Sequence, residues 1–322
     1  MRDRPRIAIV IPCYRVRDQI VDVVAAVLPA ADSVIVVDDC CPEKSGELLQ
    51  KKCTDPKLTI LFHDRNQGVG GAMITGFKAA LDGGAEIVVK MDGDGQMVVR
   101  YLPRLMAPLV AGKADFSKGN RFYDLRALRA MPRVRRFGNF GLTLLSKAAS
   151  GFWHVADPTN GFFALRSNAL RLLNFHLLDA RYFFEISLLI QLNVIRAVAI
   201  DVPIPAKYAD ENSSLNPWRA LCSFPVKLWG GLMHRIWWRY FIYDVNIVTI
   251  FLLTGGLLFC SGAIFGAWRW SNSWAFGREQ SAGTVALAML PMILGFQMLL
   301  QAVVLDMIDK PTEPVSDSME GM

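Results

Sequence analysis

Short apolar runs alternate with segments of helical periodicity over the first hundred residues of the chain. The apolar runs predict four strands, at residues 6–12, 33–37, 58–63 and 86–91. Between these runs, apolar residues recur at helical spacing in three segments, 19–28, 46–52 and 72–81. Strands that alternate with helices predict an α/β fold, in which helices cover both faces of a mostly parallel, Rossmann-like sheet.

Beyond residue 101 the pattern becomes less regular. It predicts a strand and turn at 114–121, a helix at 136–152, a turn and strand at 157–166, a helix at 183–192 and a strand at 197–203. These elements extend the same domain, and no internal repeat interrupts it.

Two long runs near the C-terminus contain no charged residue. They cover 245–268 and 281–305, and at about 1.5 Å per residue each can cross a hydrocarbon core of about 30 Å. Two buried core helices are the alternative, but paired uncharged runs of this length favour membrane spans. The segment before them, 218–243, combines Trp and Tyr with basic residues, which is typical of helices in a membrane interface. An ordinary domain-closing helix is the alternative for that segment.

These patterns predict four regions. They are a catalytic domain at 1–215, interfacial amphipathic helices at 216–243, a two-helix transmembrane hairpin at 244–308 and a disordered tail at 309–322.

Charge adds an orientation to this layout. The formal net charge of +6 is concentrated locally. A basic cluster precedes the first span, whereas the loop between the spans is nearly neutral. The cluster comprises Arg219, Lys227, Arg235 and Arg239, and the loop carries Arg269, Arg278 and Glu279. The positive-inside rule therefore predicts a cytoplasmic catalytic domain, and the first six residues do not resemble a signal peptide.

Other classes of function find little support. The six cysteines show no metal-binding spacing, and in a reducing compartment they behave as small apolar residues. The four histidines are scattered along the chain. No nucleic-acid-binding motif surrounds the basic segment 126–136, so no nucleic-acid partner is expected. The segment 68–71 (GVGG) resembles part of a dinucleotide-binding fingerprint, but its spacing is incomplete, and close helix–sheet packing explains its glycines better.

Polar residues follow each of the first four predicted strands. They are Pro12 to Tyr14, Asp38 and Asp39, Arg65 and Asn66, and Asp92 to Asp94. Because ligands of parallel α/β sheets bind at the carboxyl ends of the strands, these groups are expected to converge on one site.

Asp92 and Asp94 lie one residue apart on a glycine-containing turn. Two carboxylates in this arrangement can hold a hard divalent cation, Mg²⁺ or Mn²⁺, which shares its remaining positions with water and substrate phosphates. The turn therefore points to nucleotide diphosphate chemistry, the alternative being a plain acidic turn.

With these elements in place, the chain resembles family 2 glycosyltransferases of the GT-A fold, in the polyprenyl-phosphate branch related to dolichol-phosphate mannose synthase. The resemblance covers about residues 6–210 and rests on the order and spacing of seven motifs. These are IVIPCYR, VVDDCCPEKSGE, RNQGVGGAMITGFKAAL, VKMDGDGQ, GNRF, DPTNGFFALR and VPIPAKYADENSS. It implies metal-dependent, inverting transfer of a sugar from a UDP- or GDP-linked donor to a polyprenyl phosphate at the cytoplasmic membrane face.

The resemblance also assigns roles to individual residues. Pro12, Tyr14, Asp38, Asp39, Arg65, Asp92 and Gly93 would bind the nucleotide sugar, and Asp92, Asp94 and Gln96 would hold the metal. Arg121, Arg135, Arg136 and Asn139 would bind the acceptor phosphate, and Asp94, Arg121, Asp157 and Glu185 would carry catalysis. Each arginine fits a solvated basic surface equally well.

The chain departs from the family pattern at three places, one of which is Asn139, where the family usually has a serine if Arg135 is the matching arginine. Arg15 and Val16 replace the usual Asn and Glu, so the identity of the base stays open, and the segment 211–214 lacks the usual lysine. A processive polysaccharide synthase is disfavoured because no Gln-x-x-Arg-Trp element is present. Transfer to a lipid hydroxyl, with Asp157 or Glu185 as the base, stays open, as do a non-catalytic membrane scaffold and a homo-oligomer.

Overall fold

The computed structural model describes residues 4–123, 133–205, 217–277 and 279–315, with the backbone alone for 133–139 and 217–222. The chain divides into two compact units. The first comprises Met1–Arg235 together with Pro311–Met322, and the second comprises Ile236–Lys310.

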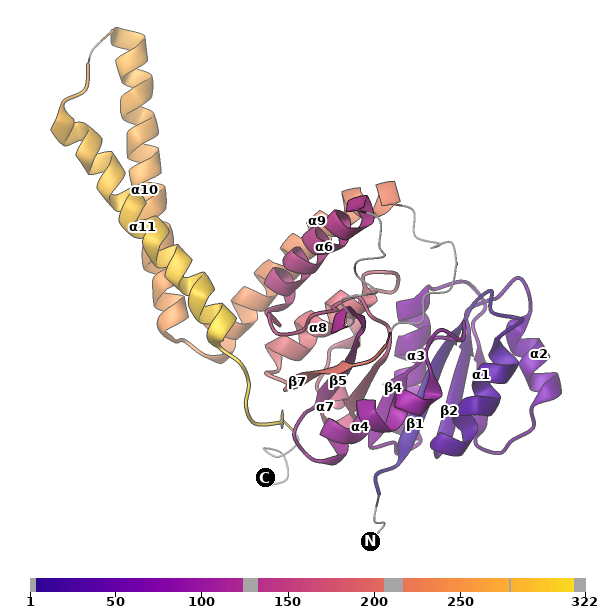
Figure 1. Ribbon diagram of the computed structural model, residues 1–322. Coiled ribbons are helices and arrows are strands. Elements are labelled where there is room, and N and C mark those ends of the chain that lie inside the picture. The colour runs from indigo at the N-terminus through magenta and orange to yellow at the C-terminus, as the bar shows by residue number, and fades with distance from the viewer. Residues whose placement is uncertain (1–3, 124–132, 206–216, 278, 316–322) are drawn as a thin grey trace. The chain divides into compact units, whose positions relative to one another are not determined.

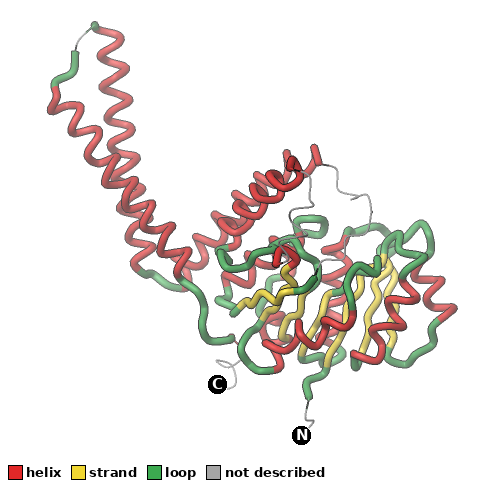
Figure 2. The backbone as a smooth tube through the Cα atoms, in the orientation of Figure 1, coloured by secondary structure: helices red, strands yellow, loops and turns green. Residues whose placement is uncertain are grey.

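The first unit contains a seven-stranded sheet in the order β3-β2-β1-β4-β6-β5-β7 (Figures 1 and 2). Neighbouring strands are parallel except for β6, which runs antiparallel to both β4 and β5. The strands are β1 (Ile7–Cys13), β2 (Ser33–Asp38), β3 (Leu58–Phe62), β4 (Ile87–Lys90), β5 (Phe116–Asn120), β6 (Phe163–Arg166) and β7 (Ala199–Pro203). All predicted strands are present, and their ends differ from the prediction by a few residues.

Helices cover both faces of the sheet (Figure 1). One face packs on α3 (Val69–Asp82), α7 (Ser167–Arg171) and α8 (Phe184–Val194). The other packs on α1 (Ile20–Val27), α2 (Ser45–Lys52) and α4 (Leu102–Val110). Successive residues of a strand point to opposite faces, so alternate residues of β1 enter the two clusters, Ala8 and Val10 on one side and Ile9 and Ile11 on the other.

Glycines in the segment 68–71 serve a purpose other than the predicted helix–sheet packing. A Cβ at Gly70 would lie 2.0 Å from the carbonyl oxygen of Asp179, and one at Gly68, where φ is +90°, would lie 2.4 Å from that of Ala180. The prediction was wrong about what these glycines pack against. They make room for the loop before α8, which covers the start of α3, and not for the sheet. In α3, Gly76 makes the close helix–sheet approach, 2.2 Å from Cγ1 of Val10.

Two further helices, α6 (Arg133–Ser150) and α9 (Pro217–Trp237), lie side by side in the first unit (Figure 1). Leu228 of α9 packs with Ala149 of α6 and Ile190 of α8. The buried guanidinium of Arg235 donates to the carbonyl oxygens of Ala148 and Ala149, both at 3.0 Å. A cation there satisfies the last carbonyls of α6 and suits the negative end of its dipole.

The second unit is a helical hairpin of α10 (Ile247–Phe276) and α11 (Ala282–Ile308), preceded by a π-helical turn at Trp238–Tyr243. Both long helices are apolar and long enough to cross a membrane. Small residues bring them together: a Cβ at Gly295 would lie 2.4 Å from the amide nitrogen of Phe259. The Tyr240 hydroxyl donates to Asp306 Oδ1 at 2.6 Å, and Arg239 pairs with Asp309 at 2.7 Å.

Part of the predicted disordered tail is ordered. The amide of Val315 donates to Asp115 Oδ2 at 3.0 Å, which attaches residues 311–315 to the first unit. Residues 316–322 lie outside the described part of the chain.

Phe77 of α3 provides a test of this packing. Its ring is fully buried and lies 6.1–6.5 Å, between centroids, from the rings of Phe163, Phe175 and Phe184. We expect Phe77→Ala to lower the free energy of unfolding by about 3–5 kcal/mol, because it removes apolar contacts and leaves a cavity. Phe62→Ala, at an exposed position of β3, is the control and should cost less than about 1 kcal/mol. Urea unfolding of the full chain in detergent measures both, and equal losses would contradict the assignment of Phe77 to the core.

Candidate active site at the carboxyl edge of the sheet

The strand order brings the predicted polar groups to one edge. Strands β3, β2, β1 and β4 are neighbours and parallel, so their carboxyl ends meet at the same side of the sheet. Cys13, at the end of β1, is paired with Asp38, at the end of β2, and Asp38 with Phe62 of β3. The convergence predicted from the sequence is therefore confirmed.

Asp38 and Asp39 are buried and bind main-chain amides. Asp38 accepts hydrogen bonds from the amides of Cys41 and Gly46, both at 2.7 Å. Asp39 accepts from the amides of Gln67 and Gly68, also at 2.7 Å, and contacts Nδ1 of His63 at 2.8 Å. These carboxylates thus hold the loops after β2 and β3 in place, and His63, whose Nε2 contacts Thr75 at 2.9 Å, supports Asp39.

Three other residues assigned to the nucleotide by resemblance border this edge. Pro12 lies within β1, the ring of Tyr14 is 40% exposed just after β1, and Arg65 is exposed after β3. Tyr14 and Arg65 are therefore accessible to a ligand, whereas Asp38 and Asp39 are enclosed by their own loops.

The turn after β4 carries the two candidate metal ligands. Asp92 is 32% exposed, and its amide donates to Sδ of Met97 at 3.2 Å. Asp94 Oδ1 accepts from the amide of Gln96 at 3.0 Å, and Gly95 adopts a φ of +74° that suits this tight turn.

The donor set limits what kind of metal site this turn could form. Among the described residues, no cluster of three or more His, Cys, Asp or Glu side chains could hold a metal ion. The two carboxylates of the turn fit a hard cation that takes most of its ligands from water and substrate phosphate, and do not fit a closed structural site.

Lys90, the last residue of β4, reaches the same turn. Its side chain is 1% exposed, and Nζ lies 2.7 Å from Asp92 Oδ1 and 3.3 Å from Glu185 Oε1. Burial by itself would lower the pKa of Lys90, but the two carboxylates outweigh it and raise the pKa above its ordinary value. Lys90 is therefore charged, and it links the Asp92 turn to the start of α8.

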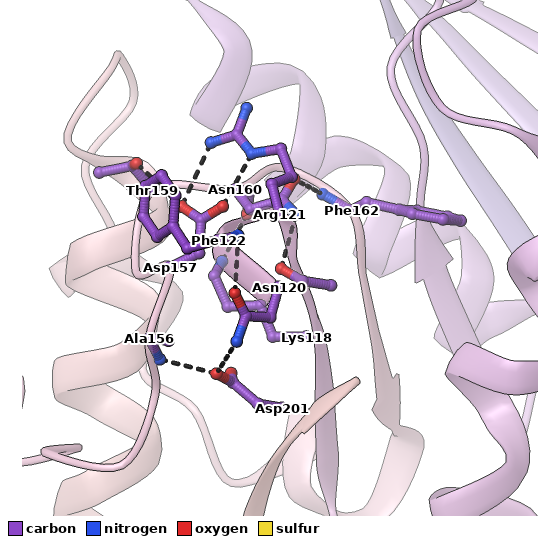
Figure 3. A network of polar contacts seen from close by, with 11 residues as sticks. Lys118, Asn120, Arg121, Phe122, Ala156, Asp157, Thr159, Asn160, Phe162 and Asp201 are labelled. Atoms are coloured by element: carbon purple, nitrogen blue, oxygen red, sulfur yellow. Dashed lines mark hydrogen bonds and ion pairs between the residues drawn. The ribbon is translucent and has the colours of Figure 1, made fainter. Parts of the chain in front are cut away.

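Arg121 and Asp157 form a second ion pair beside β5 (Figure 3). Nε of Arg121 donates to Asp157 Oδ2 at 2.7 Å, and an Nη donates to Oδ1 at 3.2 Å. Asp157 is completely buried, whereas the Arg121 side chain is 39% exposed. The two-pronged bond fixes the plane of the guanidinium, so Arg121 presents a fixed positive charge at the surface of the site.

A layer of polar side chains lies next to this pair (Figure 3). Asn120 Nδ2 donates to Asp201 Oδ2 at 3.1 Å, and the amide of Ala156 donates to the same oxygen at 2.7 Å. Oδ1 of Asp201 is buried and receives no hydrogen bond from the described residues. Burial raises the pKa of Asp201 to about 6, against the opposing effects of the Ala156 amide and Lys118.

Lys118 of β5 is also buried and donates to the carbonyl oxygen of Asn160. Burial lowers the pKa of Lys118 to about 8, although Glu185 and Asp157 act in the opposite direction. Asn160 in turn donates to the carbonyl oxygen of Gly119 at 2.6 Å. These bonds fix the loop 157–161 against β5 and so determine where Asp157 lies.

The structure thus joins Asp92 and Glu185 through Lys90 and pairs Arg121 with Asp157, which gives three ion pairs in one polar region. The side chains of Arg135, Arg136 and Asn139 lie outside the described residues. Sequence reasoning overlooked Lys90, Lys118 and Asp201. For Lys90 and Asp201, the signal that could have revealed them is a charged residue in an otherwise apolar strand, whereas Lys118 lies in the mixed strand FSKGN and gives no such signal.

Comparison with known proteins identifies the family to which the sequence is similar. Residues 8–173 match the family described as glycosyl transferase family 2. A UDP-N-acetylglucosamine–dolichyl-phosphate N-acetylglucosaminyltransferase of Methanococcus voltae is 28% identical over 190 residues, which are 55% of this chain and 75% of that protein. An undecaprenyl-phosphate mannosyltransferase of Micrococcus luteus is 28% identical over 179 residues, 55% of this chain and 72% of that protein.

Among solved structures, the chain is similar to glucosyl-3-phosphoglycerate synthase from Mycobacterium tuberculosis in complex with uridine-diphosphate. The TM-score is 0.51 and the identity 18%, over 72% of this chain and 80% of that chain. At this identity the likeness concerns the fold alone, and it confirms the predicted fold class.

The raised pKa of Asp201 makes a prediction about stability. The carboxyl group ionises near pH 3.8 in the unfolded chain and near pH 6 in the folded one. Between these values the folded state holds the extra proton, so stability falls as the pH rises through this window, by up to about 3 kcal/mol.

Asp201→Asn should remove this fall, because an amide oxygen can still accept from Asn120 and Ala156 while no charge forms. Thermal unfolding of wild type and variant between pH 4 and 7 measures the difference. Parallel pH profiles for the two proteins would contradict the assignment, and Asp82→Asn, at the exposed end of α3, should leave the wild-type profile unchanged.

Proposed function

Since the chain belongs to glycosyl transferase family 2 and is a glycosyltransferase, we propose that it transfers a sugar from a nucleotide diphosphate sugar to a polyprenyl phosphate. The observation that carries this proposal is that both candidate bases, Asp157 and Glu185, are engaged in ion pairs. Asp157 is buried in a two-pronged pair with Arg121, and Glu185 is paired with Lys90. Both carboxylates are thus engaged by cations of the protein, which disfavours their use as the base that an alcohol acceptor requires.

A phosphate acceptor needs no such base. The second pKa of a phosphomonoester is about 6, so at neutral pH the group is mostly a dianion and is itself the nucleophile. In-line attack of a phosphate oxygen on the anomeric carbon forms the new C–O bond as the bond to the nucleotide diphosphate breaks, with inversion at that carbon. The names of the relatives from Methanococcus voltae and Micrococcus luteus, which include dolichyl phosphate and undecaprenyl phosphate, support this acceptor class.

On the donor side, Tyr14 and Arg65 would contact the nucleotide beside Pro12 and Gly93, within loops held by Asp38 and Asp39. Asp92, Asp94 and Gln96 would hold Mg²⁺ or Mn²⁺. When bound, the cation would neutralise the charge that develops on the leaving diphosphate.

Two anionic substrates must meet in this reaction, so the site needs fixed positive charge. The partly exposed side chain of Arg121 would supply it, with its guanidinium oriented by Asp157. Arg135, Arg136 and Asn139 of α6 complete the proposed acceptor-phosphate site. Together these groups would reduce the repulsion between acceptor phosphate and donor diphosphate.

A polyprenyl acceptor places the reaction at a membrane surface. The hairpin of α10 and α11 would anchor the protein, with the catalytic domain on the cytoplasmic side. Neither α6 nor α9 contains an acidic residue, and both expose large apolar side chains to solvent, which suits contact with an anionic membrane. The exposed set is Phe140, Leu144 and Leu145 on α6 and Val226, Trp229 and Met233 on α9.

Two of the basic residues that predicted this orientation lie in the interior of the protein. Arg235 and Arg239 are buried and bonded within their own units, so they are not available to membrane headgroups. Lys227 is partly exposed, although it pairs with Asp179. Contact with the membrane surface would therefore come from the exposed face of α6 and α9 rather than from Arg235 and Arg239.

Asp94→Ala tests the metal role. We expect the variant to remain folded and in the membrane but to lose transfer activity by about 10²-fold or more, because one of two carboxylate ligands is gone. Transfer of radiolabelled sugar to lipid, measured across a range of Mg²⁺ and Mn²⁺ concentrations, checks this. The matched control is Asp82→Ala, which removes an exposed carboxylate at the far end of α3. Full activity of Asp94→Ala, or of the wild type in excess EDTA, would rule out the metal role.

The choice of acceptor tests the main proposal. Purified wild-type protein is offered radiolabelled UDP- and GDP-sugars with polyprenyl phosphate and, separately, with the corresponding polyprenol. We expect lipid-linked product from the phosphate alone. Product from the alcohol alone would establish a hydroxyl-directed transferase and overturn the proposal, and no product from any donor would favour a membrane scaffold.

A further inference from the structure

Lys90 is a charged residue at the end of a buried strand. The other residues of β4 are apolar and buried, and a lysine at this position must bring its charge out of water. Isolating an ammonium group in a protein interior costs several kcal/mol unless it is paired. An apolar residue would fill β4 without that penalty, so packing alone does not account for Lys90.

The ammonium group is enclosed by two carboxylates and a loop. Nζ lies 2.7 Å from Asp92 Oδ1 and 3.3 Å from Glu185 Oε1. A Cβ at Gly161 would lie 2.4 Å from Nζ and 2.7 Å from Asp92 Oδ2. The loop 157–161 therefore passes directly over the Lys90–Asp92 pair, and a side chain at residue 161 would displace that pair.

The two carboxylate oxygens of Asp92 have different surroundings. Oδ1 is bound by Lys90, whereas the described residues give Oδ2 no hydrogen bond. Asp92 remains partly exposed, and Lys90 is held from its other side by Glu185. The orientation of Asp92 is thus set by a residue that a ligand at the turn does not need to touch.

We infer that Lys90 is a positioning residue that fixes Asp92 and tunes the charge of the turn toward a divalent cation, with Glu185 as its counter-charge. The inference rests on the proposed function in one respect, the binding of a cation at Asp92 and Asp94. It assigns Glu185 to the support of Lys90 rather than to contact with the sugar or the acceptor.

The charges make a signed prediction about cation affinity. Lys90, Asp92 and Glu185 carry one positive and two negative charges, a net charge of −1. Lys90→Met changes this to −2, Glu185→Gln changes it to zero, and the double variant restores −1. If Lys90 and Glu185 act through charge, cation affinity should follow this order, although neither residue is a ligand.

The experiment is a titration of the full chain in detergent with Mn²⁺, in the presence of UDP or GDP, with free Mn²⁺ measured by electron paramagnetic resonance. Relative to wild type, Lys90→Met should bind Mn²⁺ about tenfold more tightly and Glu185→Gln about tenfold more weakly, because a unit charge acts at short range in a poorly solvated site. The double variant should return to within about threefold of wild type. Lys78→Met, at an exposed position of α3, controls for the change in net charge and should not shift the titration.

A purely structural role for Lys90 would not produce shifts of opposite sign. Wild-type affinity in either folded single variant, or a shift in the opposite direction, would overturn the inference while leaving the cation site intact. Absence of Mn²⁺ binding to the wild type would remove the cation site and the inference with it. Should Lys90→Met fail to fold, as judged by circular dichroism, Glu185→Gln alone still decides, because wild-type Mn²⁺ affinity after the loss of this one negative charge would overturn the inference.

Discussion

The pairing of buried charges at the carboxyl edge of the sheet is the interaction on which the rest of this site depends. Lys90 lies between Asp92 and Glu185, and Asp157 is buried beneath Arg121. Each of these groups would be unfavourable alone in a poorly solvated position. Because the partners come from different elements, satisfying the charges also fixes β4 relative to α8, and β5 relative to the loop 157–161. The same contacts therefore contribute to both the fold and the orientation of the functional groups.

The general plan of the first unit could be predicted from the sequence, because apolar runs and helical periodicity report directly on burial. The parallel arrangement of strands β1 to β4 followed from their alternation with helices, whereas their order in the sheet was not predicted. The reversal of β6 between β4 and β5 was not specified, because a four-residue strand has the same pattern in either direction. The helices α10 and α11 were predictable because a long run without charged residues forms either a membrane span or a buried core helix.

The site was only partly predictable, because residue type indicates chemistry but does not indicate partners. Asp38 and Asp39 were assigned to the nucleotide, yet they hold main-chain amides of their own loops. Asp157 was considered as a base, yet it orients Arg121. The contacts of Asp39 and Asp157 join residues far apart in the sequence, which no local pattern encodes. Lys90 was overlooked because one charged residue at the end of an apolar strand does not alter the periodicity.

The pairing of both candidate bases leads to a requirement on the acceptor. An enzyme that activates a hydroxyl group needs a carboxylate or imidazole able to accept a proton at the moment of attack. At this edge Glu185 is paired with Lys90 and Asp157 with Arg121, so using either carboxylate as a base would require breaking its ion pair. A nucleophile that already carries its charge avoids this conflict, and a phosphate is such a nucleophile. The site must then attract a second anion next to the diphosphate, which the fixed guanidinium of Arg121 is placed to do. A structure that uses its carboxylates to hold its cations is therefore better suited to join two anionic substrates than to deprotonate an alcohol.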